Sequence, residues 1–443
     1  MLTWISLMHS EKGNCMTNDK KLEMFFDHDR WEMLIDRADQ KGIDKKLLIS
    51  LCEPKTRVRL LEHISSGKYR IAPPHIAEIP KDDGTMREVF VNEPIDRIFL
   101  SLYNDLMFEL YHDAIHPACK SYQKGIGCGK IVKEISARVT DLPDNIPAYK
   151  ADLSKYFDSV NLQTVEKTLK RFSTGSVLDQ IIWEYYHNDL VFDKQNNLIK
   201  RYGSLKQGCA FASFLANVIL YPIDEVLSHL DILYVRYSDD ILMIGPDAET
   251  AITCLKAMLT PMGLALNPKK IERIRPDKWF SFLGFSIKGT DITFSKKTVR
   301  NFQKEIEHRT IKNRKQTAEQ AVRSVNSYLH RGYIIDGQRF GFGAYFLPIV
   351  NVKADLVTMD NFVKDCIRAV DSGKRTIGGI GVNTYLPEGV VQRGKGKNVT
   401  ANRQKWKDKY GDEVISGYYT LSCMQNAIRQ GKSVYESLVR CAA

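Results

Sequence analysis

The sequence has few of the features that mark secreted, zinc-containing or membrane proteins. Its nine cysteines are scattered through 443 residues without a CxxC pair or a Cys/His cluster. This argues against a disulfide framework and a structural zinc site, and favours reduced thiols. No apolar run is long enough to span a bilayer. The opening MLTWISLMHSEKGNC lacks the basic start and long apolar stretch of a signal peptide. We therefore expect a cytoplasmic protein with no membrane partner.

The composition is that of a globular protein with a positive charge. Hydrophobic residues make up 43% and charged residues 26% of the chain, which is too long for a single ordinary core. Lys and Arg number 64 against 53 Asp and Glu, so the net charge is +11. Composition alone does not distinguish a nucleic-acid partner from an anionic membrane.

The first third of the chain is predicted to be helical, interrupted by one hairpin. Residues 17–70 have the apolar spacing of charged amphipathic helices. Two short apolar runs over 76–92 flank Asp83-Gly84, a hairpin turn signal, and the hairpin carries Lys81 and Arg87. A helix is predicted from Pro94 to about Tyr111.

Short strands and helices alternate from 147 to 294, which predicts an α+β lobe with a central sheet. The predicted strands are Ala148–Leu153, Ile232–Tyr237, Ile241–Gly245 and Phe280–Lys288, and the predicted helices are 161–172, 176–187, 208–229 and 247–262. The chain then becomes helical and basic, with ten Lys or Arg against three Glu over 295–331. Beyond 371 it is rich in Gly and Lys, which indicates a loop or small appendage.

The segment VRYSDDILMIG is the sharpest feature of the sequence. Its apolar strands flank a tight turn that carries Asp239 and Asp240. Two adjacent carboxylates repel each other, and a hard divalent cation such as Mg²⁺ removes that repulsion. An alternative is a solvated hairpin turn without a metal.

A second acidic segment favours the metal. YKADLSKYFDSV is a predicted strand that ends at Asp152 and runs into a helix. Asp152 together with the hairpin pair can bind two metals for in-line phosphoryl transfer. A helix N-cap is the structural alternative for Asp152. For Asp158 we expect an N-cap or a loop-orienting role, not metal binding.

Five segments resemble palm motifs A to E of reverse transcriptases in order and approximate spacing: DLSKYFDSV, LKQGCAFASFLANVIL, RYSDDILMIG, LNPKKIE and FSFLGFSI. In addition, IPKDDGTMREVFV and PIDRIFLSLYNDL resemble the fingers of the bacterial enzymes. The resemblance covers roughly residues 70–300. It implies a right-hand α+β polymerase with fingers, a palm built on an antiparallel sheet flanked by helices, and a helical thumb. The implied divisions are 1–70 N-terminal helices, 71–146 fingers, 147–294 palm, 295–370 thumb and 371–443 basic C-terminal extension.

The resemblance also implies a role for each matching residue. Asp152, Asp239 and the backbone carbonyl of Leu153 resemble ligands of two Mg²⁺ ions, with Mn²⁺ as a substitute, and Asp240 resembles a supporting carboxylate. The remaining implied roles are Phe157 as a steric gate against ribose, Lys81 and Arg87 as triphosphate-binding residues, Gln207 and Gly208 as the loop against the nascent base pair, and Lys270 as the acid that protonates pyrophosphate. These imply dNTPs, an RNA template and nascent DNA as partners.

Each of these side chains has a structural alternative. Phe157 can simply pack beneath the sheet, Lys81 and Arg87 can be solvated hairpin charges, and Gly208 can be a helix-opening turn residue. The neighbouring Lys269 competes with Lys270 for the same role. Trp406 and Tyr410 can stack on bases or anchor the tail.

Several positions depart from the commonest bacterial pattern. Lys206 stands where motif B usually has proline, and we expect it to loosen the loop and to bring a positive charge near the nascent pair. The second block, YQKGIGCG, lacks its usual Arg-Pro-Gly-Arg. There is no Asn-Ala-x-x-His or Val-Thr-Gly signature of retron enzymes and no Cys/His-rich nuclease tail of group II intron proteins.

The remaining polymerase core, thumb and basic extension look like the antiphage defence reverse transcriptases, which work with an RNA encoded beside them. The basic stretches 295–331 and 391–409 would then bind duplex and structured RNA. Alternatives are a template-independent or protein-primed DNA polymerase, a group II intron or retron type enzyme, an RNA-dependent RNA polymerase and an inactive RNA-binding palm.

Overall fold

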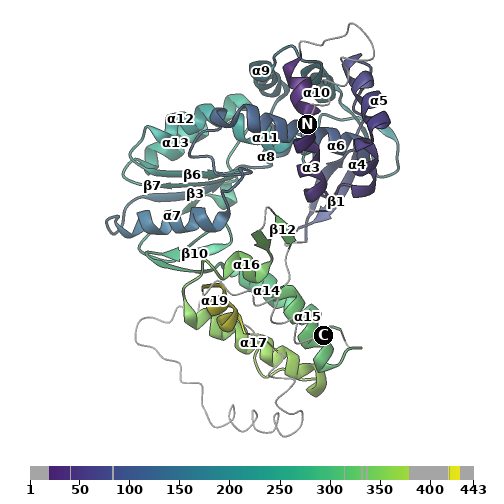
Figure 1. The fold of residues 1–443 in the computed structure, drawn as a ribbon. Helices are drawn as coiled ribbons and strands as arrows, with labels where there is room; N and C mark the ends of the chain where they lie inside the picture. Colours follow the sequence, from purple (N-terminus) through teal and green to yellow (C-terminus); the bar gives the residue numbers. More distant parts are fainter. Residues whose placement is uncertain are drawn as a thin grey trace. The chain divides into compact units, whose positions relative to one another are not determined.

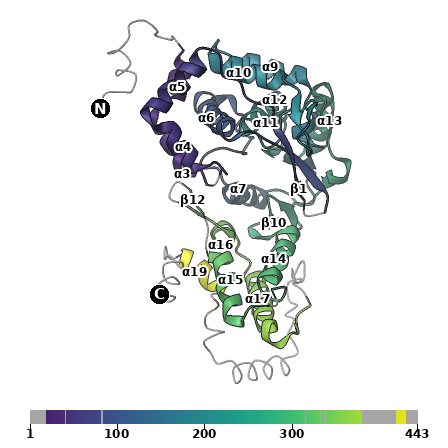
Figure 2. The ribbon, with the colours of Figure 1, turned by 90° about the vertical axis from the view of Figure 1, so that its right-hand side faces the viewer.

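A computed structural model of the chain describes residues 19–39, 41–81, 84–313, 315–330, 333–335, 338–378, 418 and 420–429. The chain divides into two compact units, which Figures 1 and 2 show as ribbons. The first unit comprises Met1–Gln123 and Tyr149–Glu272, and the second comprises Lys124–Ala148 and Arg273–Ala443. The proposed 391–409 stretch, Trp406 and Tyr410 lie outside the described residues.

The first unit begins with short helices that pack around a long one, as predicted for 17–70. They are α2 (Lys20–Phe25), α3 (His28–Arg37), α4 (Lys45–Cys52) and α5 (Pro54–Ser65), and the long helix is α6 (Pro94–Leu110). Asp19, Asp27 and Asp44 cap α2, α3 and α4 by accepting backbone N–H bonds. The buried faces of these helices join the main hydrophobic core of the unit.

The predicted hairpin is present and belongs to a small sheet of order β2-β1-β4-β5. Its strands are β1 (His75–Pro80), β2 (Met86–Val91), β4 (Leu190–Phe192) and β5 (Leu198–Lys200). Gly84 supplies a left-handed turn residue with φ +82°, whereas Asp83 lies outside the described residues. β2 is an edge strand of this sheet.

The central sheet has the order β6-β7-β3-β8 and holds the acidic segments. Its strands are β6 (Leu233–Tyr237), β7 (Asp240–Ile244), β3 (Ala148–Asp152) and β8 (Glu272–Arg273). The helices of this part are α8 (Tyr156–Ser159), α9 (Leu162–Phe172), α10 (Val177–His187), α11 (Ala212–Val218), α12 (Tyr221–Ser228) and α13 (Ala248–Leu259). Helices α12 and α13 cover one face of the β6–β7 pair (Figure 1).

Two sequence predictions are wrong in detail. The helix predicted over 208–229 begins only at Ala212, because Gly208 has a φ of +107° that no helix contains, and it is two helices, with Pro222 in the first turn of the second. The strand predicted over Phe280–Lys288 is a tight hairpin, because Leu283 and Gly284 both adopt left-handed conformations.

The second unit combines a three-stranded sheet with helices. The sheet has the order β11-β10-β9, from β9 (Phe280–Phe282), β10 (Phe285–Lys288) and β11 (Asp291–Phe294), and α7 (Cys128–Thr140) packs on it. The other elements are α14 (Lys296–Arg309), α15 (Ala318–His330), β12 (Tyr333–Ile335), β13 (Gln338–Phe340), α16 (Phe342–Phe346), α17 (Lys353–Ser372) and α19 (Leu421–Arg429). None of the described helices combines the length and apolar character needed to cross a membrane.

Candidate active site

The hairpin of β6 and β7 presents two aspartates at its tip. Tyr237 pairs with Asp240 across the ladder, so Ser238 and Asp239 form the turn. Ser238 adopts the left-handed φ of +57° that two-residue hairpin turns require. The amide of Leu153 donates to the Asp239 carbonyl at 3.1 Å, which fixes the end of β3 beside the turn. The structure therefore brings Asp152 to the same place as Asp239 and Asp240.

The electrostatics of these three carboxylates reflect their closeness. Asp152 is 6% exposed. Burial raises the pKa of Asp239, and the charge of Asp152 raises it further. Burial, followed by the charges of Asp239 and Asp152, raises the pKa of Asp240 to about 6. Such a cluster is unfavourable at neutral pH unless a cation neutralises it.

Lys270 forms an ion pair with one carboxylate of this cluster. It ends the 3₁₀ helix η3 (Pro268–Lys270), and the preceding Asn267 donates its N–H to the Asp152 carbonyl at 2.8 Å. The Lys270 Nζ lies 2.6 Å from Asp152 Oδ2. Although burial acts to lower it, the hydrogen bond with Asp152 raises the pKa of Lys270. Lys270 rather than Lys269 thus pairs with Asp152.

The donor chemistry of the cluster fits a hard divalent cation, because carboxylate oxygens are the ligands that Mg²⁺ prefers. In the described part of the chain, no three His, Cys, Asp or Glu side chains are already arranged as a metal site. Asp152 is instead paired with the Lys270 ammonium. A cation can therefore bind Asp152 only if the Lys270 ammonium moves away or if the two cations bind different oxygen atoms of the carboxylate.

Phe157 lies on α8, immediately after β3. Its half-buried ring packs edge-to-face on Tyr156 at a centroid distance of 5.5 Å. Its carbonyl accepts the Leu205 N–H at 3.0 Å, which joins α8 to the Gln207 loop. The expected N-cap role of Asp158 is wrong, because Asp158 is the third residue of α8 and Lys155 occupies the N-cap position.

Gln207 and Gly208 lie along the free edge of β2. The Phe90 N–H donates to the Gln207 carbonyl at 2.7 Å. A Cβ atom on Gly208 would stand 2.7 Å from the Phe90 carbonyl oxygen, and its φ is +107°. Glycine is therefore required by the close approach of two backbones, and α11 begins only at Ala212.

Lys81 and Arg87 lie on the hairpin of β1 and β2, and both are exposed. The charge of Arg87 acts on Tyr122, whose ring lies near the β6–β7 turn. The charge of Lys81 acts on Asp158, next to Phe157.

The expectations for Lys206 are wrong. Its side chain is 2% exposed, so it brings no charge to the solvent-facing side of the loop. Nζ donates to the Asn188 carbonyl at 3.0 Å and lies 4.9 Å from the Tyr185 ring centroid. These contacts anchor the loop to the end of α10 instead of loosening it. Burial lowers the pKa of Lys206 to about 8.

We predict that Lys206→Met stabilises the protein at pH 7. The folded pKa of about 8 is below the usual 10.5, so the charged lysine costs stability below pH 8. Relative to the variant, the wild type gains stability as pH rises from about 8 to 10.5. The expected gain of the variant is on the order of 1–2 kcal/mol at pH 7 and smaller at pH 9.5. Urea denaturation at both pH values measures it.

The matched control for this measurement is Lys200→Met on the exposed strand β5. This control should change the free energy of unfolding little at either pH. A loss of stability in Lys206→Met at pH 7 would show that the contacts with Asn188 and Tyr185 outweigh the burial of the charge.

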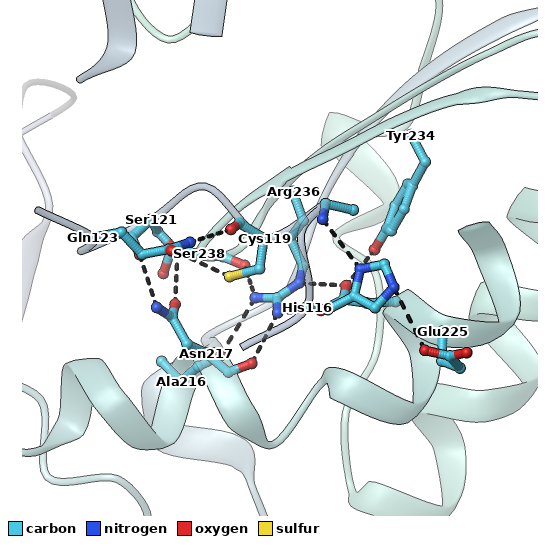
Figure 3. A network of polar contacts seen from close by, with 12 residues as sticks. His116, Cys119, Ser121, Gln123, Ala216, Asn217, Glu225, Tyr234, Arg236 and Ser238 are labelled. Atoms are coloured by element: carbon cyan, nitrogen blue, oxygen red, sulfur yellow. Dashed lines mark hydrogen bonds and ion pairs between the residues drawn. The ribbon is translucent and has the colours of Figure 1, made fainter. Parts of the chain in front are cut away.

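A buried polar network beneath the turn was not predicted from the sequence (Figure 3). Arg236 and Asp224 are both 0% exposed and form a two-pronged ion pair. The Arg236 guanidinium also donates to the carbonyl oxygens of Ala216, Asn217 and Ser238. Its signal in the sequence was a lone arginine in an otherwise apolar strand, which requires a buried acidic partner.

Comparison of the chain with known protein families gives a match over the segment that contains most of the motifs. Residues 79–287 match the family model described as "Reverse transcriptase (RNA-dependent DNA polymerase)". This match contains strand β2, Asp152, the β6–β7 turn and Lys270. It confirms the predicted α+β right-hand polymerase fold.

Two curated relatives are similar at low identity. The "Putative COX1/OXI3 intron 1 protein" of Saccharomyces cerevisiae is 22% identical over 176 residues, which are 40% of this chain and 21% of that protein. "Protein YkfC" of Escherichia coli is 19% identical over 286 residues, which are 55% of this chain and 74% of that protein. The chain thus spans about a fifth of the yeast relative.

Among solved structures, apo telomerase from Candida tropicalis matches 68% of this chain and 57% of its own, at 11% identity and a TM-score of 0.42.

Proposed function

We propose that the chain is an RNA-directed DNA polymerase that adds dNTPs to a 3′-hydroxyl. One observation carries the proposal: β3 and the β6–β7 turn bring Asp152, Asp239 and Asp240 together within the residues that match the reverse transcriptase family. Burial and the neighbouring negative charges raise the pKa of Asp239 and of Asp240. A bound divalent cation would relieve this repulsion, which favours cation binding.

The proposed roles around the carboxylates follow from their contacts. Asp152, Asp239 and the Leu153 carbonyl would hold two Mg²⁺ ions, with Mn²⁺ as a substitute, and Asp240 would support them. When bound, the ions would supply activation of the 3′-hydroxyl and stabilisation of the leaving pyrophosphate. Lys270, which pairs with Asp152, would donate a proton to pyrophosphate once it is released.

The hairpin and the Gln207 loop would bind the incoming nucleotide. Arg87 and Lys81 are proposed to bind the triphosphate. The ring of Phe157 would occupy the space that a ribose 2′-hydroxyl needs. Gln207 and Gly208 would pack against the nascent base pair, held by their backbone contact with Phe90.

Helix α14 of the second unit supports nucleic-acid binding. Lys297, Arg300 and Lys304 recur at helical spacing on one face, all of them exposed. Phe302 and Ile306 are buried on the opposite face. A stripe of positive charge along a helix suits a phosphate backbone, so binding should weaken steeply with salt.

We further propose that the template is a structured non-coding RNA and that the enzyme acts in antiphage defence in the cytoplasm. Support comes from the sequence, which departs from the commonest bacterial pattern at Leu205-Lys206-Gln207 and in the YQKGIGCG block and has neither the Asn-Ala-x-x-His nor the Val-Thr-Gly signature of retron enzymes. Sequencing of the RNA and DNA that copurify with the protein tests it. A structured RNA encoded beside the gene, with complementary DNA, is expected; random cellular RNA would contradict the defence proposal.

The polymerase activity is tested with poly(rA)·oligo(dT) and labelled dTTP or UTP supplied separately. We predict incorporation of dTTP with Mg²⁺, because the carboxylates need a small hard cation, and little incorporation with Ca²⁺, which tolerates looser geometry.

Preference for UTP would favour an RNA polymerase. Incorporation without the template, or DNA attached covalently to the protein, would favour the template-independent or protein-primed alternatives. Comparable rates with both ions would contradict the two-metal chemistry.

A further inference from the structure

The loop Cys119–Gln123 is tied to two neighbouring segments of the first unit and is closed by a hydrogen bond of its own. The Lys120 N–H donates to the Arg236 carbonyl at 2.8 Å, and the Arg236 N–H donates to the Ala118 carbonyl at 2.9 Å. Ser121 and Asn217 exchange two hydrogen bonds, each of 2.7 Å. The side-chain amide of Gln123 returns to the Cys119 carbonyl (Figure 3). The loop therefore has a defined position beside β6 and α11.

Tyr122 projects from this tied loop toward the β6–β7 turn. Its φ of +56° is unusual for a bulky aromatic residue, and such a conformation persists only where the surroundings hold it. The hydroxyl group donates to Ser238 Oγ at 3.3 Å, while the residue remains 45% exposed. Its ring lies 6.4 Å from the ring of Tyr237. The polar network thus places an exposed aromatic ring against the residue that precedes Asp239.

The turn is held from two directions. From below, the buried Arg236 guanidinium donates to the Ser238 carbonyl at 3.3 Å. From the loop side, Tyr122 contacts the Ser238 hydroxyl, which also interacts with the Asp239 carboxylate. Two anchors on one residue restrict the rotation of the turn. A displacement of a reacting group by about 1 Å can cost two orders of magnitude in rate.

We propose that Tyr122 is a positioning residue of the active site, whose hydroxyl holds Ser238 and thereby orients the Asp239 carboxylate. This inference rests on the proposed function. Tyr122 acts on the chemical step through Ser238, and it does not belong to the surface that we assign to the incoming nucleotide. Its loss should therefore reduce kcat and leave the KM for dNTP nearly unchanged.

The test compares Tyr122→Phe, Ser238→Ala and the double variant on poly(rA)·oligo(dT) with dTTP and Mg²⁺. Tyr122→Phe removes only the hydroxyl group and should lower kcat about tenfold, equivalent to about 1.4 kcal/mol. The KM for dTTP should change less than about twofold, because no nucleotide contact is lost. The double variant should be no slower than Ser238→Ala, because both substitutions remove the same hydrogen bond.

Tyr111→Phe is the matched control, since Tyr111 donates a hydrogen bond of the same 3.3 Å length to the Phe172 carbonyl. It should retain wild-type kcat. Unchanged kcat in Tyr122→Phe, or additive effects in the double variant, would overturn the inference while the wild type stays active. No incorporation by the wild type would instead overturn the proposed function and the inference with it. If Tyr122→Phe fails to fold, Ser238→Ala alone decides, and wild-type kcat in that variant overturns the inference.

Discussion

Asp239→Asn should lower dTTP incorporation on poly(rA)·oligo(dT) by about a thousandfold or more. The substitution keeps the size of the side chain and removes a charge that we propose binds the catalytic cations. Bound cations stabilise the transition state by several kcal/mol, and each 1.4 kcal/mol of lost stabilisation lowers the rate about tenfold. Single-nucleotide extension assays measure the loss, and Asp152→Asn should behave in the same way.

Loss of activity in this variant must be separated from loss of the fold. The raised pKa of Asp240, about 6, belongs to the same cluster. A carboxyl group with a raised folded pKa contributes stability below its unfolded pKa near 4, and that contribution is lost as pH rises through 6. At pH 7.5 without divalent ions, removing one charge of the cluster should therefore raise the Tm. Added Mg²⁺ should raise the Tm of the wild type more than that of Asp239→Asn.

The control is Asp36→Asn on the exposed face of α3, which should retain wild-type activity. Substantial dTTP incorporation by a folded Asp239→Asn protein would exclude this residue as an essential ligand. A Tm that falls at pH 7.5 would show that Asp239 is held by favourable contacts in the absence of metal.

Phe157→Val should relax the discrimination between dNTPs and NTPs by roughly 100-fold, the range that one side chain in a pocket can supply. The ring is half-buried against Tyr156 and joined through its carbonyl to the Gln207 loop. A smaller side chain would open space for the ribose 2′-hydroxyl without removing a charged contact. The ratio of kcat/KM for dTTP and UTP on the poly(rA)·oligo(dT) template measures the effect.

Phe157→Tyr is the matched control, because it keeps the ring and should keep the discrimination. The half-buried position also predicts a modest cost for Phe157→Val, about 1–2 kcal/mol of unfolding free energy from lost burial. If the folded valine variant still rejects UTP as the wild type does, Phe157 only packs beneath the sheet. Selectivity would then have to come from another residue.

The acidic hairpin and the strand that ends at Asp152 were predictable because their signals are local. A two-residue turn between apolar strands fixes which residues stand at its tip, and the observed ladder pairs Tyr237 with Asp240. That Asp152 joins them was expected from the chemistry of paired carboxylates and from the resemblance to reverse transcriptases, not from strand periodicity. Strand periodicity does not say which strands are neighbours in a sheet. The structure supplies this through the bond from Leu153 to the Asp239 carbonyl.

Lys206 shows where local reasoning failed. A lysine in a loop is normally solvated, and nothing adjacent in the sequence indicates that Asn188 and Tyr185 surround its ammonium group. The late start of the helix predicted over 208–229 has a similar origin, because Gly208 has a left-handed conformation and lies against the backbone of Phe90 on a distant strand.

The sequence by itself determined the elements and the chemical character of the site, because periodicity, turn residues and carboxylates are properties of short segments. Tertiary structure alone decided how the carboxylates are held. The Arg236–Asp224 pair, the Ser121–Asn217 bonds and the contact of Tyr122 with Ser238 join residues between 12 and 116 positions apart. Packing brings these partners together, and a buried polar group left without a hydrogen bond would be costly. A single segment of the sequence does not specify either effect.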